Sequence, residues 1–233
     1  MEFTVKADDF RKALLQASIH GSKSPELYNK VRLEFANSYC VFACSDSNLI
    51  IRTKIALYNS TVPEGTILVL KDFNNLLRTS NYLYFPIVTI ELLYEINKIL
   101  VKSGEKRFYV AIDSDADFAH FEHFNEYSAG SDSVSYDIAI MERRFKKIRY
   151  AADKTSTTFN RVYFNENKMY ATDSKRIALS TSDSFLAKFD FSVTVDAMEL
   201  ICNTLTGIFD LYKNNGFLIF KDNYFNEVII PVG

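Results

Sequence analysis

Hydrophobic and polar positions follow one pattern that occurs four times along the chain. In each copy a short β-like run leads directly into a segment with apolar residues at helical spacing, and this order spans residues 3–17, 67–80, 134–152 and 191–205. Two or three runs rich in β-branched or aromatic residues, the types that strands prefer, follow each helix. The sequence therefore predicts a β-α-β-β-β unit in four copies.

Two such units form one domain, because about 110 residues are enough to bury a core. We predict one domain over residues 1–118, a linker over 119–133 and a second domain over 134–233. The linker breaks the strand alternation, is rich in acidic and small residues and contains an Ala-Gly-Ser turn signal. With the helices gathered on one face of antiparallel sheets, the expected fold class is α+β.

Composition narrows the possible functions. Lys and Arg total 27 against 29 Asp and Glu, so the formal charge of −2 differs from that of a freely binding, strongly basic DNA-binding protein. Only 7 glycines and 4 prolines are present, which leaves few tight loops for phosphates and makes a nucleotide-binding enzyme unexpected. The 3 cysteines form no C-x-x-C pair, so neither a disulfide framework nor a zinc site is indicated.

The beginning of the sequence has no basic and apolar signal pattern, and no run of apolar residues is long enough to span a membrane. We therefore expect a cytoplasmic protein without membrane partners.

The third predicted helix carries the densest positive charge. Cations at 143, 144, 146, 147 and 149 accompany an apolar stripe formed by Met141, Phe145, Ile148 and Ala152. Such a rod either contacts phosphates, which requires only cations, or is simply a solvated helix face. The candidate DNA-binding residues, drawn from three helices and the segments next to them, are Arg11, Lys12, Lys23, Lys71, Arg78, Arg143, Arg144 and Lys147.

Two other groups of residues could form a site. His120, Glu122 and His123 lie close to Asp113, Asp115 and Asp117, but their spacing matches no metal-binding pattern and favours a solvated acidic linker. Tyr82, Tyr84 and Phe85 form either a base-stacking platform or, as we expect, part of the core and its strand pairs. No nucleophile elbow, Walker loop or H-E-x-x-H helix is present, so we predict no catalytic residue, metal or cofactor.

Three stretches resemble the bacterial sliding clamp, the beta subunit of DNA polymerase III. Residues 1–5 and the following helix are similar to the start of the clamp, and residues 99–108 with 116–118 are similar to the end of its first domain. Residues 171–178, Ala-Thr-Asp-Ser-Lys-Arg-Ile-Ala, resemble an Ala-Thr-Asp-Gly-His-Arg-Leu-Ala stretch of its second domain. The resemblance implies a non-catalytic processivity factor that encircles duplex DNA, with helices lining a positive lumen.

The resemblance also implies an assembly. The bacterial clamp closes as a dimer of three-domain subunits, which gives twelve β-α-β-β-β units per ring, whereas this chain has four. Retained ring geometry predicts a cyclic trimer closed by head-to-tail contacts between sheet edges. The absence of a third domain leaves open a monomer that never closes.

The family also docks short linear motifs of polymerases and clamp-loader subunits. By resemblance, the peptide-binding pocket consists of Phe159, Thr172, Ser174, Lys175, Arg176, Ile177, Val228 and Ile230. Ser174 and Lys175 replace the Gly-His pair of the family, and the third domain that forms the far wall is missing. The alternative function is therefore a clamp-like adaptor or decoy that binds clamp partners without encircling DNA.

Overall fold

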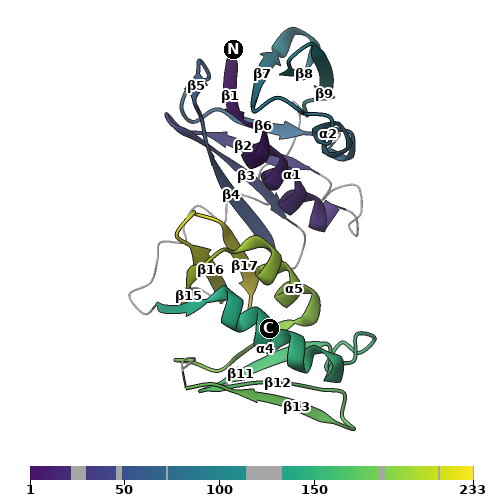
Figure 1. The fold of residues 1–233 in the computed structure, drawn as a ribbon, viewed down its shortest axis with the longest axis vertical. Helices are drawn as coiled ribbons and strands as arrows, with labels where there is room; N and C mark the ends of the chain where they lie inside the picture. Colours follow the sequence, from purple (N-terminus) through teal and green to yellow (C-terminus); the bar gives the residue numbers. More distant parts are fainter. Residues whose placement is uncertain are drawn as a thin grey trace. The chain divides into compact units, whose positions relative to one another are not determined.

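The four β-α-β-β-β units are present in the computed structural model (Figure 1). The chain divides into two compact units, and the first of these, Met1–Glu126, contains two of the β-α-β-β-β repeats. The first repeat comprises β1 (Glu2–Lys6), α1 (Ala7–Gly21), β2 (Val31–Phe35), β3 (Tyr39–Ser45), β4 (Ile50–Ala56) and the short β5 (Asn59–Ser60). The second comprises β6 (Ile67–Leu70), α2 (Phe73–Ser80), β7 (Ile87–Leu93), the 3-10 turn η2 (Tyr94–Ile96), β8 (Lys98–Ser103) and β9 (Lys106–Ala111).

The second unit of the fold, Tyr127–Gly233, repeats this order. Its first repeat comprises β10 (Val134–Asp137), α4 (Ile138–Ile148), the 3-10 turn η3 (Arg149–Ala151), β11 (Arg161–Asn165), β12 (Lys168–Thr172) and β13 (Ile177–Thr181). Its second comprises β14 (Phe191–Thr194), α5 (Val195–Thr204), β15 (Ile208–Asn214), β16 (Phe217–Asp222) and β17 (Glu227–Pro231). The predicted fold class is confirmed.

The structure describes residues 1–21, 30–45, 49–71, 73–113, 133–183, 187–214 and 216–232. All of the predicted linker except Ser133 lies outside these residues, so its bounds stay a prediction. Within the described residues, no helix is both long and apolar enough to cross a membrane.

The first strand of each repeat pairs with the other repeat of its unit. In the first unit, β1 joins the sheet β5-β1-β7-β8-β9, while β6 joins β4-β3-β2-β6. The second unit follows the same rule, with β10 beside β15 and β14 beside β11. All of these pairs are antiparallel, and the shared topology supports the repeat predicted from the hydrophobic pattern.

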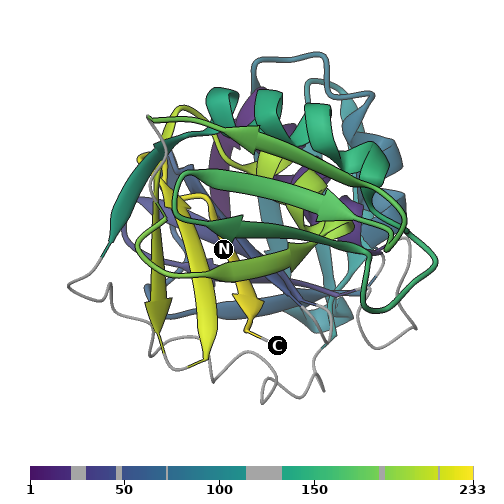
Figure 2. The ribbon, with the colours of Figure 1, turned by 90° about the horizontal axis from the view of Figure 1, so that it is seen from below.

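Alternating side chains of these strands form the core of each unit. Phe3 packs edge-on against Phe35 at a ring distance of 4.9 Å, so the exchanged strand β1 contributes directly to the first core. In the second unit, Phe164 and Phe191 are register partners whose rings stack 4.2 Å apart. The sheet that contains them, β13-β12-β11-β14, has green strands in Figure 2.

Helices α1, α4 and α5 each start at the residue that follows the first strand of their repeat. The Asp137 carboxylate accepts a hydrogen bond from the Ala139 backbone N–H at 2.8 Å, which caps α4. Thr194 caps α5 in the same way through the Ala197 N–H at 3.2 Å. Helix α4 packs on β12 and β13 and also contacts α5 (Figure 1). The cap fixes where α4 starts, and the apolar stripe determines which face of the helix is turned to solvent.

The expectation that Tyr82, Tyr84 and Phe85 belong to the core is wrong. Their exposed fractions are 53%, 75% and 55%, because they lie in the loop between α2 and β7. The Lys106 ammonium lies 5.2 Å from the Tyr82 ring centroid and 4.7 Å from that of Tyr84. These aromatic side chains therefore form a surface cluster that includes a cation.

Candidate functional site

One face of α4 presents positive charge to solvent. Arg143, Lys146 and Lys147 are exposed, whereas Met141, Phe145 and Ile148 are buried. Positions 143, 146 and 147 are neighbours on a helix surface, so these cations form one patch. Lys146 is paired with Glu142 at 2.6 Å, but neither Arg143 nor Lys147 forms an ion pair with any described residue. These two cations are free to meet an external anion.

Arg144 is not part of this patch, which corrects its predicted exposure and role in DNA binding. Only 4% of the residue is exposed. Its guanidinium donates to the Ser180 hydroxyl at 3.2 Å, the Ser180 carbonyl at 2.5 Å and the Asn167 carbonyl at 2.9 Å. The spacing 141, 144, 145, 148 places Arg144 on the buried stripe, and that signal was present in the sequence.

The other predicted cations have different surroundings. Arg11 donates to the Leu83 carbonyl at 2.8 Å and pairs with Asp8 at 3.1 Å, so it mainly connects α1 to the end of α2. Lys12 and Arg78 are exposed on α1 and α2. Lys23 lies outside the described residues.

Lys71 forms an ion pair with the buried Asp113 at 3.1 Å, and Lys30 pairs with the same carboxylate at 2.6 Å. Burial by itself raises the pKa of Asp113, but the hydrogen bonds and charges of the two lysines outweigh it and hold that pKa below its ordinary value. Lys71 is therefore engaged by a carboxylate of its own unit, which it shares with Lys30.

Helix α5 supplies acidic groups at the end of the α4 patch. Glu199 pairs with Arg149 at 3.5 Å and with Lys154 at 3.3 Å. Lys154 was not among the predicted site residues, because it follows the helix and its contact with Glu199 joins residues far apart in the sequence. Arg143 and Lys147 are thus the exposed cations of α4 that have no ion pair among the described residues.

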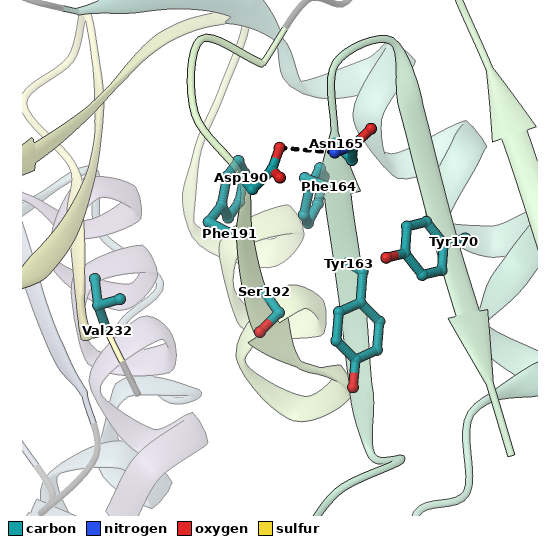
Figure 3. A pocket seen from close by; sticks show the side chains of 8 residues that line it. All are labelled: Tyr163, Phe164, Asn165, Tyr170, Asp190, Phe191, Ser192 and Val232. Carbon is teal, nitrogen blue, oxygen red and sulfur yellow. Dashed lines mark hydrogen bonds between the residues drawn. The ribbon is translucent and has the colours of Figure 1, made fainter. Parts of the chain in front are cut away.

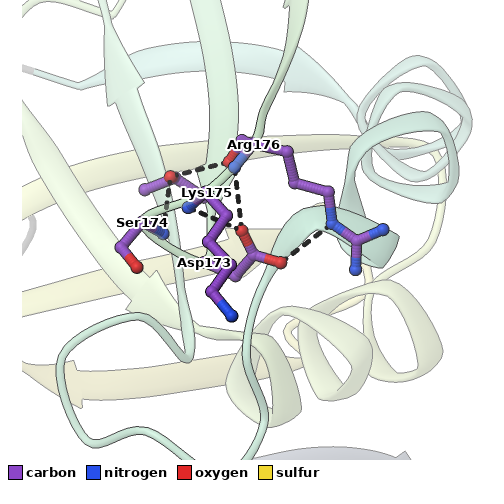
Figure 4. Close-up of polar contacts among 5 residues, drawn as sticks. Asp173, Ser174, Lys175 and Arg176 are labelled. Carbon is purple, nitrogen blue, oxygen red and sulfur yellow. Dashed lines mark hydrogen bonds and ion pairs between the residues drawn. The ribbon is translucent and has the colours of Figure 1, made fainter.

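The turn between β12 and β13 holds Arg176 in a defined place (Figure 4). One Asp173 carboxylate oxygen accepts the backbone N–H groups of Lys175 and Arg176, each at 3.0 Å, and the other accepts Arg176 Nε at 2.8 Å. The Thr172 hydroxyl donates to the Arg176 carbonyl at 2.8 Å. The guanidinium lies 5.8 Å from the centroid of the exposed Tyr150 ring. Hydrogen bonds therefore define the conformation of the turn, and they place Arg176 next to an aromatic ring.

An apolar pair follows directly on this turn. Ile177 and Leu179 point outward from β13 and are 65% and 55% exposed. Their register partners on β12 are Thr172 and Tyr170. Because β13 is the edge strand of its sheet, this surface is open on one side.

The structure brings together only part of the predicted peptide pocket. Thr172, Ser174, Lys175, Arg176 and Ile177 are contiguous at the turn and the start of β13, while Phe159 is half-buried in the segment before β11. The expectation that Val228 and Ile230 offer side chains to a peptide is wrong, because both are buried on β17.

A hollow of about 270 Å³ in the second unit is lined in part by Tyr170, the register partner of Leu179 (Figure 3). The residues that line it come from three strands and the end of the chain: Tyr163, Phe164, Asn165, Tyr170, Asp190, Phe191, Ser192 and Val232. None was a predicted site residue, and the sequence carries no motif for the hollow. Tyr163 and Tyr170 stack 5.2 Å apart, and Asn165 donates to Asp190 at 2.9 Å.

Within the described residues, no group of three or more His, Cys, Asp or Glu side chains is arranged to hold a metal ion. Of the candidate group His120, Glu122, His123, Asp113, Asp115 and Asp117, only Asp113 belongs to the residues that the structure describes.

Comparison with solved structures shows the fold of the bacterial sliding clamp. DNA polymerase III beta subunits from Thermotoga maritima and Pseudomonas aeruginosa, the latter with a ligand, superpose with TM-scores of 0.79 and 0.82, each at 16% identity. The Helicobacter pylori beta clamp bound to a DNA ligase peptide superposes with a TM-score of 0.75 at 15% identity. The matches cover 99%, 100% and 100% of this chain.

The chain spans 64% of the length of the first two of these clamps and 66% of the third. No protein-family model matches the sequence, and no curated protein matches it. The resemblance noted in the sequence is thus confirmed at the level of the fold: over its whole length the chain has the fold of about two thirds of a DNA polymerase III beta subunit.

The Asp173 turn is expected to stay formed well into the acidic range. Hydrogen bonds from the Arg176 and Lys175 N–H groups and the Arg176 guanidinium hold the pKa of Asp173 below its ordinary 3.8. A lowered pKa means that the carboxylate stabilises the turn above pH 3.8 and loses this effect as the pH falls through the folded value. Following the Arg176 amide signal by NMR during acidification should give a midpoint below 3.8. A midpoint above 3.8 would contradict this geometry, and Asp173→Asn should abolish the transition.

Proposed function

We propose that this protein is a DNA sliding clamp, a processivity factor that encircles duplex DNA and does not itself catalyse a reaction. The observation that carries the proposal is the match of the whole chain to bacterial beta subunits, together with the free cations on the exposed face of α4. The proposed DNA contacts are Arg143 and Lys147, with Lys12 and Arg78 on the other helices; Lys71 and Arg11 contribute less because of their internal contacts.

A small number of contacts with DNA phosphates is appropriate for a sliding clamp. Each neutralised phosphate adds affinity that salt weakens, and tight binding would oppose sliding. A closed ring retains DNA by its topology, so a chain of net charge −2 needs only a locally positive surface. We place its activity in the cytoplasm and propose no metal or cofactor.

The ring we propose is a trimer. Four β-α-β-β-β repeats are one third of the twelve that the clamp resemblance implies for a closed ring. Strands β9 and β13, one in each unit, are edge strands of their sheets, and an edge strand can pair with a strand of another chain. Because they lie in different units, pairing them between copies would give head-to-tail contacts, which can close into a ring.

We also propose that the outer face of β13 docks peptides. The H. pylori clamp binds a DNA ligase peptide, and a P. aeruginosa clamp binds griselimycin. In this chain Ile177 and Leu179 offer an apolar surface, and Arg176, held by Asp173, lies at its end. This pairing of apolar contact with one fixed polar group is typical of peptide sites. The proposed occupants are short motifs of polymerase and clamp-loader subunits.

Reversing the two free charges on α4 tests the DNA contacts. Arg143→Glu with Lys147→Glu should reduce retention on nicked circular DNA about tenfold and flatten the dependence on salt, because two phosphate contacts are lost. Gel filtration of the labelled protein with plasmid, before and after linearisation, measures this. Lys168→Glu, an exposed cation on β12, is the matched control and should retain DNA like the wild type. Equal retention by the double variant would contradict the proposed lumen face.

Placing a charge in the apolar pair tests the peptide surface. Ile177→Asp should weaken binding of a fluorescein-labelled peptide, the DNA ligase peptide of the H. pylori complex, by about tenfold or more in fluorescence polarisation. Ile208→Asp, at an exposed position on β15 in another sheet, should bind normally. Unchanged affinity of Ile177→Asp would remove β13 from the site.

The solution mass distinguishes the ring from the alternative. Light scattering across micromolar concentrations should give about three times the 26.8 kDa of one chain. A monomer throughout would overturn ring closure by this chain alone. It would favour an adaptor or decoy that binds clamp partners without encircling DNA.

A further inference from the structure

Strand β13 has almost no apolar anchor on its inner face. The residues that point inward from it are Ala178 and Ser180, whereas β11 turns Val162 and Phe164 inward. Small side chains bury little apolar surface, so they hold a strand weakly. As an edge strand, β13 also has only one ladder of backbone hydrogen bonds, with β12. Something else must hold the strand against α4.

Arg144 supplies that connection. It reaches from the buried stripe of α4 to the Ser180 hydroxyl and carbonyl and to the Asn167 carbonyl in the β11–β12 turn, at 3.2, 2.5 and 2.9 Å. Hydrogen bonds from a charged donor are about twice as strong as neutral ones. The three contacts hold β13 and the adjoining turn to the same helix.

An apolar residue would fit position 144 without a desolvation cost. The neighbouring stripe positions are Met141, Phe145 and Ile148, all buried. Burying a guanidinium costs free energy unless acceptors compensate, and burial lowers the pKa of Arg144. What arginine adds here is a fixed direction: it binds two carbonyls and a hydroxyl at defined positions.

We infer that Arg144 is a positioning residue that reaches from the DNA-facing helix and fixes strand β13, and with it the outward surface of Ile177 and Leu179. The consequence for peptide binding rests on the proposed function. Arg143 and Arg144, adjacent in sequence, then serve different surfaces: Arg143 faces solvent for DNA, and Arg144 supports the strand that docks peptides.

The second unit also offers a matched control. Arg161 on β11 donates to the Ser192 hydroxyl at 2.8 Å and the Ser192 carbonyl at 3.0 Å, so it connects to β14, the opposite edge of the same sheet. Arg144→Met and Arg161→Met thus remove the same kind of contact from the two edges. A loss confined to β13 in the first variant cannot be attributed to a general weakening of the sheet.

The test combines amide hydrogen exchange of the whole chain with peptide polarisation. In Arg144→Met, exchange of residues 177–181 should accelerate about tenfold and the labelled ligase peptide should bind about tenfold more weakly. Arg144→Lys, which keeps donors for the carbonyls, should recover part of both losses. Arg161→Met should accelerate exchange in β14 and leave β13 and peptide affinity as in the wild type.

Unchanged exchange in β13 of Arg144→Met would overturn the inference, as would equal acceleration throughout the second unit. Should that variant not fold, Ser180→Ala removes one acceptor and should show a smaller effect at the same strand. If the wild type binds no peptide, the proposed docking function fails, while exchange in β13 still decides the role of Arg144.

Discussion

Strand exchange between paired repeats is the constraint on which this structure depends. Neither repeat of a unit completes a sheet by itself, because β1 and β6, like β10 and β14, pair with the other repeat. Each sheet is thus complete only when strands of both repeats are present. The two repeats of each unit therefore form together, and the helices are held in place by sheets that both repeats share.

Helix α4 has two different faces in this arrangement: one packs on the sheet and the other is exposed and positively charged. Its apolar stripe must match the sheet, while its opposite face carries positive charge at no cost to packing. Arg144 lies on the buried face, although a charged side chain would be expected on the exposed one. The helix thus separates an outward electrostatic surface from an inward hydrogen-bonding contact within consecutive residues.

Much of the fold could be predicted from the sequence, because each strand and helix has its own hydrophobic period and the order repeats four times. The pairing of strands could not, since it depends on residues far apart in the chain. The position of Arg144 on the apolar stripe was visible in its spacing from Met141 and Ile148, but its acceptors Ser180 and Asn167 were not.

Sequence pattern did not predict correctly which apolar residues are buried. Two examples are the aromatic residues around position 84 and the strand at 228–230. Hydrophobic composition predicted a buried cluster for Tyr82, Tyr84 and Phe85, yet the loop before β7 leaves them in solvent. For Val228 and Ile230, resemblance suggested a peptide site where packing has buried both side chains. Sequence pattern indicates which residues are apolar, while tertiary packing decides which of them are covered.

The exchanged first strands also affect how the chain is made on the ribosome. Strand β1 carries Phe3 and Val5 and finds its partner β7 only about 80 residues later. At translation rates of roughly 5–20 residues per second, this interval is on the order of 4–16 seconds. During that time an apolar strand with an unpaired edge is open to other chains. Strand β1 is therefore a segment at which binding by a chaperone during synthesis would prevent contacts with other chains.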